Sequence, residues 1–223
     1  MNIIEALQSR YSVRDFKPEP IAKETIQKIV EAATRSPSTS NTQCWEIYLI
    51  GGDVLERIRH AYIDRYEQDI PGNPELPGLP PDKLPPALAQ RKNQMRTERL
   101  KLCGFDPNDP KSMKSFLAPN YKFFGAPILV ILCMDRTLGE WQIFDLGLLS
   151  QSIMLAAQEF GVDSISASSI TRYPDILRKE LAIPDNLIIT IGIALGHVNT
   201  QSIVNTYRSS RRPINEVVTF RGI

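Results

Sequence analysis

Residues 128–134 read Ile-Leu-Val-Ile-Leu-Cys-Met, a continuous apolar run that follows Gly125-Ala126-Pro127. A strand that is apolar at every position is buried on both faces, so this run predicts a central strand of a sheet. The next apolar stretch, residues 141–160, is apolar on nearly all sides of a helix. Such a helix is buried, either in a large core or at a subunit interface. Gly161 is its expected end.

Shorter patterns on either side of these two stretches predict the remaining elements. Further strands are expected at 45–50, 162–167 and 187–195, with a short β-like end at Val217 to Phe220. Helices are expected from Ile3 to just before Arg10, at 22–35, at 53–66 with Asp53 as its N-cap, and at 174–181. Roughly four central strands interleaved with helices indicate the α+β or α/β class.

Residues 67–120 differ in composition from the rest of the chain. Seven of the 17 prolines fall between Pro71 and Pro86, which excludes a regular helix or a central strand there. Residues 86–102 are charged and favour a helix with little apolar face, and Pro107 and Pro110 break it. We interpret 1–223 as a single domain that carries 67–120 as an insertion, either a plain surface elaboration or a functional lid.

Composition excludes several functional classes. Lys plus Arg is 26 and Asp plus Glu is 25, a net charge of +1 that gives no basis for nucleic-acid binding. Cys44, Cys103 and Cys133 are far apart, and with two histidines they do not suit a zinc site. Reduced thiols fit a cytoplasmic protein. The N-terminus lacks signal-peptide features, and no apolar run is long enough to span a bilayer.

Motifs for several common chemistries are absent. The sequence contains no dinucleotide-binding G-x-G-x-x-G after a strand, no phosphate-binding P-loop, no G-x-S-x-G and no H-E-x-x-H. Gly192 and Gly196 are expected to serve close packing. His197 is interpreted as a structural histidine at a strand end, and Cys44 as a neutral packing thiol.

Two arginine-rich clusters remain. In Arg10-Tyr11-Ser12-Val13-Arg14, an extended backbone would put the first, third and fifth side chains on one side, where two guanidiniums suit a phosphate. Taken alone, this cluster also fits a solvated surface turn. Residues 205–213 form the second cluster, and small polar residues fill 38–43 and 168–169. FMN would use both arginine-rich clusters and both polar segments. Its phosphate needs arginine, while its ribityl chain and pyrimidine edge need polar partners.

Four stretches together resemble the nitroreductase-like family of FMN-dependent NAD(P)H oxidoreductases. The first is Arg10 to Arg14, similar to the family's R-x-S-x-[RK], and the second is 36–45, similar to A-P-S-x-x-N-x-Q-P-W. The third is the long apolar helix with Gly161-Val162. The fourth combines 191–197 with 211–218, similar to R-x-P-L-x-E-V-V. The likeness runs from residue 3 to 220, apart from about 67–120.

The resemblance implies a fold and a site. The fold would be an α+β mixed sheet flanked by helices in an intertwined homodimer, with the long helix in the dimer core and FMN at the interface. At the phosphate and ribityl end would lie Arg10, Ser12, Arg14, Arg208 and Arg211. Flanking the flavin from the other subunit would be Pro37, Ser38, Thr39 and Asn41. Beside the flavin N5 edge would lie Ser168 and Ser169.

Three positions depart from the family pattern. Cys44 stands where proline is usual, Ser168-Ser169 where some relatives have Glu-Gly, and Ser209 where several have lysine. The last two affect individual assignments at the flavin rim and leave the family assignment intact.

The resemblance also implies the chemistry. NADH or NADPH would pass a hydride to the flavin, and a nitroaromatic, quinone or similar electron-poor acceptor would then take it in ping-pong fashion, with no catalytic side chain required. Alternatives are an enone reductase, a reductive dehalogenase or a flavin-modifying enzyme of the same fold, or a non-catalytic flavin-binding module. The sequence leaves open the natural acceptor and the preferred nucleotide.

Overall fold

The structure, a computed structural model, describes residues 2–76, 78, 80 and 83–223. Its helices are α1 (Ile3–Ser9), α2 (Lys23–Ala33), α3 (Gly52–Glu67), α4 (Pro86–Cys103), α5 (Pro110–Tyr121), α6 (Glu140–Glu159) and α7 (Pro174–Leu181). Its strands are β1 (Trp45–Gly51), β2 (Ile128–Asp135), β3 (Asp163–Ala167) and β4 (Leu187–Gly196). Short 3₁₀ segments are η1 (Thr39–Asn41), η3 (Phe123–Gly125), η4 (Ser168–Thr171), η5 (Ile203–Thr206) and η6 (Ile214–Glu216).

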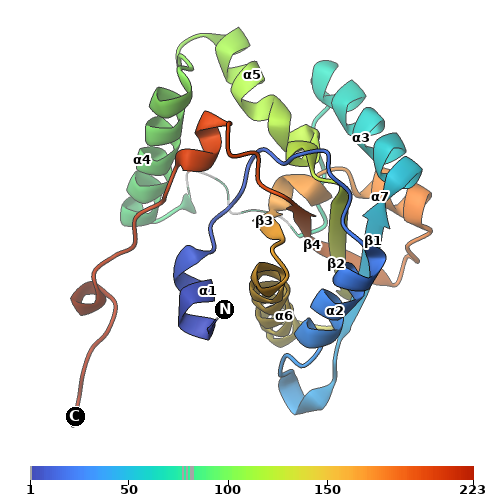
Figure 1. Cartoon of the computed structure of the whole chain (residues 1–223), viewed down its shortest axis with the longest axis vertical. Coiled ribbons are helices and arrows are strands. Elements are labelled where there is room, and N and C mark those ends of the chain that lie inside the picture. Colours follow the sequence, from blue (N-terminus) through green and yellow to red (C-terminus); the bar gives the residue numbers. More distant parts are fainter. Residues whose placement is uncertain (1, 77, 79, 81–82) are drawn as a thin grey trace.

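The four strands form one sheet in the order β1-β2-β4-β3, and each neighbouring pair is antiparallel. β2 is therefore a central strand, as its continuous apolar run predicted. Ser12 adds a parallel bridge to Ser164 at the edge of β3, which makes the sheet mixed at that edge. Helices flank the sheet on both faces (Figure 1), and the predicted α+β class is confirmed.

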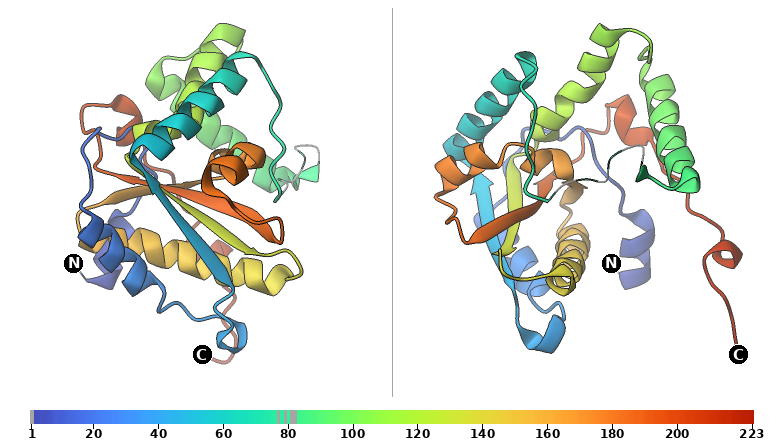
Figure 2. Two further views of the ribbon diagram at one scale, coloured as in Figure 1. Left: turned by 90° about the vertical axis from the view of Figure 1, so that its right-hand side faces the viewer. Right: turned by 180° about the vertical axis from the view of Figure 1, so that it is seen from behind.

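The two faces of the sheet have separate cores, because side chains alternate along β2. Leu129 and Ile131 point into a core with α3 and α7, whereas Val130 and Leu132 point into a core with α2 and α6. Figure 2 shows these helix pairs on opposite sides of the strands. β2 is buried on both faces for this reason.

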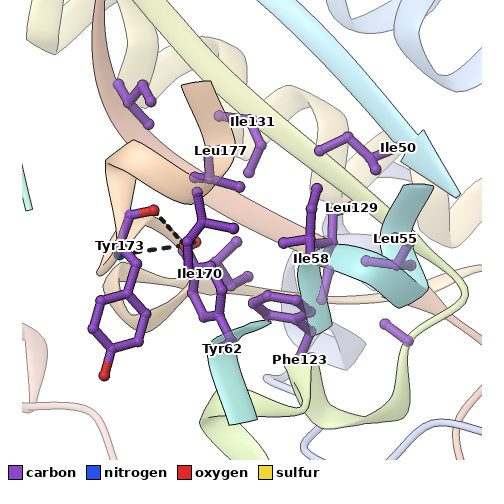
Figure 3. Packing of buried hydrophobic residues seen from close by; sticks show 14 of the residues in the cluster. Ile50, Leu55, Ile58, Tyr62, Phe123, Leu129, Ile131, Ile170, Tyr173 and Leu177 are labelled. Atoms are coloured by element: carbon purple, nitrogen blue, oxygen red, sulfur yellow. Dashed lines mark hydrogen bonds between the residues drawn. The ribbon is translucent and has the colours of Figure 1, made fainter. Parts of the chain in front are cut away.

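The buried side chain of Tyr62 fixes η4 within the first core; Figure 3 shows Tyr62 packed among Ile170, Phe123 and Tyr173. The hydroxyl of Tyr62, on α3, donates to the carbonyl oxygen of Ile170 at 2.7 Å. Ile170 packs directly over Gly192 of β4, where a Cβ atom would lie 2.2 Å from Ile170 Cγ2. The predicted packing role of Gly192 is therefore confirmed, and η4 is held by both α3 and the sheet.

The long helix α6 is only half covered within this chain. Its inner side packs on the sheet and α2, but Trp141 is 72% exposed and Phe144 is 59% exposed. Ile3 and Ile4 on α1 are exposed as well. Gly161, with φ +67, ends the helix as predicted. An apolar surface of this kind is typical of an interaction face.

Two sequence predictions about local structure were wrong. Gly51, not Asp53, is the N-cap of α3, because Gly52 adopts φ +57 and lets the strand turn directly into the helix. Val217 to Phe220 form no strand, since the segment is exposed and has no neighbouring strand among the described residues. The predicted break at Pro110 is present, but Pro110 also begins α5, which was not predicted, at a position behind the N-cap Asp109 that needs no N–H donor.

The 67–120 segment comprises an irregular stretch followed by α4 and α5. Residues 77, 79, 81 and 82 of its proline-rich part lie outside the described residues. α4 buries Leu100, in agreement with the small apolar face expected there. It packs against η5, and α5 packs against α3. Among the described residues, no helix is long and apolar enough to cross a membrane.

Candidate functional site

The two arginine-rich clusters line one cavity. Its volume is about 470 Å³, and it lies between the end of α1, residues 10–14 and residues 207–211. We call it the arginine cavity. Five of the predicted cofactor residues line it, namely Arg10, Ser12, Arg14, Arg208 and Arg211. Segments almost two hundred residues apart in the sequence therefore meet at this point.

Backbone pairing sets the direction of the N-terminal side chains. Ser12 is bridged to Ser164, and the N–H of Val13 donates to the carbonyl oxygen of Ser164 at 3.1 Å. Val13 is fully buried. Because side chains alternate along extended backbone, its neighbours Ser12 and Arg14 face the arginine cavity, as the sequence spacing predicted.

Asn205 joins the N-terminal segment to the C-terminal one. Its Oδ1 accepts a hydrogen bond from the backbone N–H of Arg14 at 2.8 Å. Its Nδ2 donates to the carbonyl oxygens of Asp15 at 2.7 Å and Asn199 at 2.9 Å. The buried amide is satisfied at both ends. The sequence analysis gave Asn205 no role, because a single polar residue beside a basic cluster carries no periodic signal.

The guanidiniums of the arginine cavity lack anionic partners. Arg208 stacks on the ring of Tyr11, with its Cζ 3.4 Å from the ring centre. Within the part of the chain that the structure describes, Arg10, Arg14, Arg208 and Arg211 form no ion pair with a carboxylate. Burial, and then the charge of Arg211, lower the pKa of Arg10. Burial and the charge of Arg99 lower the pKa of Arg14 to about 10.

These pKa shifts define what the cavity can bind. Both downward shifts reflect positive charge that is partly desolvated and held near like charge. The arginines still carry charge at neutral pH, because a pKa of about 10 is well above 7. An anion with several oxygen acceptors would relieve the repulsion and accept the free N–H donors.

Ser168 and Ser169 lie at the other end of β3. Ser12 is bridged to Ser164, four positions before Ser168, and four residues of strand span about 13 Å. Neither serine lines the arginine cavity. The Oγ of Ser169 is buried and has no hydrogen-bond partner among the described residues. Its hydrogen-bonding capacity is therefore unused within the described part of the chain.

The polar loop, residues 37–43, lies between α2 and β1, away from the arginine cavity (Figure 1). Asp145, a buried carboxylate on α6, accepts from the Thr39 N–H at 3.0 Å and from the Thr39 hydroxyl at 3.3 Å. Ser38 Oγ accepts from the Gln43 N–H at 2.9 Å. Ser40 and Asn41 adopt positive φ values of 53 and 57. Asp145 was missed, since it lies within an otherwise apolar helix sequence.

The structure thus divides the eleven predicted site residues among three places. Five line the arginine cavity, two lie in η4 and four lie in the polar loop. Within one chain the polar loop does not reach the arginine cavity. Cys44, next to the loop, has its pKa raised by burial and then by Asp145, which agrees with a neutral thiol. His197 Nδ1 lies 3.1 Å from the carbonyl oxygen of Gly161, a structural contact.

Sequence comparison links the chain to known reductases. The sequence model of the Nitroreductase family matches residues 7–197. A nitrobenzene nitroreductase of Ectopseudomonas oleovorans is 32% identical over 219 residues, which cover 98% of this chain and 96% of the relative. A chloronitrobenzene nitroreductase of Comamonas testosteroni is 31% identical, with coverage of 98% and 96%.

Structure comparison agrees. The crystal structure of the FMN and NADPH-dependent nitroreductase NfnB from Sphigopyxis sp. strain HMH has a TM-score of 0.93, 27% identity and full coverage of both chains. The fold described above is therefore found, along its whole length, in a solved structure.

Proposed function

We propose that this chain, which belongs to the nitroreductase family, is an FMN-dependent oxidoreductase that transfers hydride from NADPH or NADH to nitroaromatic acceptors. The observation that carries the proposal is the arginine cavity. Four guanidiniums meet there without a carboxylate partner among the described residues. A phosphate monoester is the ligand that best matches this charge.

The residues present fit FMN. Arg10, Arg208 and Arg211 would hold its phosphate, while Ser12 and Arg14 would meet the ribityl chain. The unpartnered Ser169 Oγ and the backbone of η4 would then lie beside the flavin N5 edge. When bound, FMN supplies the two-electron chemistry, taking hydride from the nucleotide and passing it on. The protein contributes position and charge, so no side-chain nucleophile is needed.

A second copy of the chain would complete the site. The exposed aromatic side chains of α6 and the apolar face of α1 need cover. The polar loop is held to α6 by Asp145 and contributes no residue to the arginine cavity of its own chain. In a homodimer Pro37, Ser38, Thr39 and Asn41 of the partner would flank the flavin. The exposed tail with Val217, Val218 and Phe220 would gain contacts in an intertwined dimer.

The relatives indicate the acceptor. Two of them are named for nitrobenzene and chloronitrobenzene, and both are neutral single-ring nitroarenes. We extend the proposal to quinones, which are electron-poor rings of similar size. Nucleotide and acceptor would occupy the same cleft in turn, giving ping-pong kinetics. The described cysteines are free thiols, and a cytoplasmic location is part of the proposal.

A spectrum of the purified protein, followed by turnover assays, tests the function. We expect a bound flavin spectrum and oxidation of NADPH or NADH that depends on nitrobenzene or a quinone. Protein that stays colourless after reconstitution with FMN contradicts the proposal. Bound FMN without turnover of any acceptor would indicate a flavin-binding module. Turnover confined to enones or halogenated rings would indicate a specialised reductase.

A further inference from the structure

A second cavity, of about 480 Å³, lies between α4, α5, η3 and η5. Phe105, Phe116 and Phe124 form much of its wall, together with Val204. Arg14 belongs to this wall as well as to the wall of the arginine cavity. We call this space the phenylalanine cavity. Its volume is in the range of cavities that bind small organic molecules.

Two guanidiniums in the phenylalanine cavity have no anionic partner among the described residues. Arg99 lies over the ring of Phe116, with its Cζ 5.0 Å from the ring centre, and its buried Nε has no hydrogen-bond acceptor. Arg14 donates through Nη1 to the carbonyl oxygen of Ser12 at 2.9 Å. Burial lowers the pKa of Arg99, and burial with the charge of Arg99 lowers the pKa of Arg14.

The other charged residues of the wall leave the cavity positive. Asp15 lines it, but Asp15 Oδ2 accepts from Asn199 Nδ2 at 3.3 Å, and no ion pair joins Asp15 to either arginine in the described part of the chain. Lys122 adds another cation at the wall. The phenylalanine cavity therefore combines aromatic walls with positive charge that no carboxylate of the described residues neutralises.

The aromatic wall is preformed. Phe123 and Phe124 adopt φ values of 52 and 59, which are unusual for bulky residues, and Gly125 follows with φ 75. The carbonyl oxygen of Phe124 accepts from the backbone N–H of Phe16 at 2.9 Å, which holds this turn in place. A wall that is already ordered loses little entropy when a ligand binds.

We propose that the phenylalanine cavity binds a small aromatic carboxylate, with its rings against Phe116 and Phe124 and its carboxylate on Arg99 and Arg14. A planar carboxylate matches the geometry of a guanidinium fork. Aromatic rings pack favourably against phenylalanine rings, whereas a fully hydrated ion such as inorganic phosphate would leave these walls without partners. This site needs neither FMN nor the acceptor chemistry.

Arg14 couples the two cavities. Arg14 lines both cavities, so a ligand that draws its side chain toward one cavity weakens its contact with a ligand in the other. The effect is the same in both directions by thermodynamic linkage. Aromatic acid binding therefore reduces the affinity for FMN through its ribityl chain, and bound FMN reduces the affinity for the aromatic acid.

Calorimetric titration of the purified protein, as isolated, with 2-naphthoate and its neutral analogue 2-naphthamide tests the site. We expect 2-naphthoate to bind at least about tenfold more tightly than the amide, because charge-assisted bonds are lost in the amide. Arg99→Gln should weaken 2-naphthoate binding by about tenfold or more. Arg96→Gln, one turn earlier on the exposed side of α4, is the matched control and should leave it unchanged.

A second variant tests the cavity without changing charge. Val204→Phe fills part of the space and should abolish 2-naphthoate binding while FMN content stays constant. Equal affinities for acid and amide, no effect of Arg99→Gln, or binding that vanishes in excess NADPH would each overturn the proposal. Naphthoate binding to protein that takes up no FMN would refute the proposed function alone. Protein that takes up FMN and turns over with it, but binds no naphthoate in either its FMN-loaded or its FMN-free form, would refute this site alone.

Discussion

The arginine cavity and the polar loop differ in whether their polar groups find partners within the chain. In the arginine cavity four guanidiniums have no carboxylate among the described residues, and burial lowers the pKa of Arg10 and Arg14. In the polar loop Asp145 and Ser38 accept the backbone and hydroxyl hydrogens, so the local hydrogen bonds close within the chain.

The difference indicates what each region requires from outside. The arginine cavity lacks negative charge, which only a ligand can bring. The polar loop is tied to α6 through Asp145, and residues 39–43 are exposed, so they can contact another molecule. The proposed dimer joins the two, and each of the following variants alters one side of the comparison.

The largest expected effect comes from separating the two regions. The double substitution Trp141→Asp with Phe144→Asp places charge on the exposed face of α6. We expect the dimer dissociation constant to rise by roughly 1,000-fold or more, since each buried aromatic side chain contributes about 1.5–3 kcal/mol. Light scattering after gel filtration should show the 25.1 kDa chain instead of twice that mass, with FMN lost.

Leu117→Asp is the control for that experiment. Leu117 is exposed on α5, at the opposite end of the molecule from α6 (Figure 1). This variant should remain a dimer and keep its FMN. A wild-type protein that is monomeric and still holds FMN would contradict the proposed dimeric site, because the polar loop of a partner would then not be needed to bind FMN.

An intermediate effect is expected from the arginine cavity itself. Arg10→Ala should weaken FMN binding by about 10- to 100-fold, because hydrogen bonds to charged groups contribute about 1.5–3 kcal/mol. Riboflavin, which lacks the phosphate, should bind the variant as well as it binds wild type. Fluorescence titration measures both affinities.

Arg212→Ala provides the matched control in this experiment. Arg212 lies outside the arginine cavity and pairs with Glu216. Its loss should leave both affinities unchanged. Equal losses of FMN and riboflavin in Arg10→Ala would assign Arg10 to the folding of the cavity rather than to the phosphate.

The smallest effect is expected beside the polar loop. Burial and then Asp145 raise the pKa of Cys44, which lowers its thiolate fraction at a given pH. Asp145→Asn removes the negative charge, so the Cys44 pKa should fall and alkylation by iodoacetamide at pH 8 should be roughly threefold faster. Mass spectrometry of the alkylated peptide follows the rate.

The pH–rate profile separates the charge effect from mere exposure. A lower pKa moves the midpoint of the profile to lower pH, whereas a loosened loop raises its plateau. Cys103 is the internal control, because burial raises its pKa, Arg99 and Arg14 oppose that rise, and Asp145 makes no contribution. An unmoved midpoint for Cys44 would show that burial alone sets its reactivity.

Apolar pattern made most of the fold predictable. The run at 128–134 and the long helix at 141–160 were correctly assigned, because complete burial removes polar residues from a segment. The tail at 217–220 was not, because its β-like sequence has no neighbouring strand in one chain. The break at Pro110 was correctly assigned, but the helix that begins there was not predicted, since proline marks the end of one helix and the start of another equally well.

The site was predictable only where residues of one kind gather. The arginine clusters are visible in the sequence because two or three cations fall within five positions. Asn205, Asp145 and Tyr62 are each isolated polar residues in the sequence, and each holds part of the site in place through its side-chain hydrogen bonds. One polar residue in an ordinary context gives no pattern, so only coordinates reveal its partner.

The hydrogen bond between Arg14 and Asn205 also determines when the arginine cavity can form during translation. These residues are 191 positions apart. At about 5–20 residues per second, Arg14 leaves the peptidyl-transferase centre roughly 10–40 s before Asn205 is added. During that interval the N-terminal half of the arginine cavity has no opposite wall. The nascent chain therefore cannot hold a phosphate there until the segment that contains Asn205 and Arg208 has been synthesised.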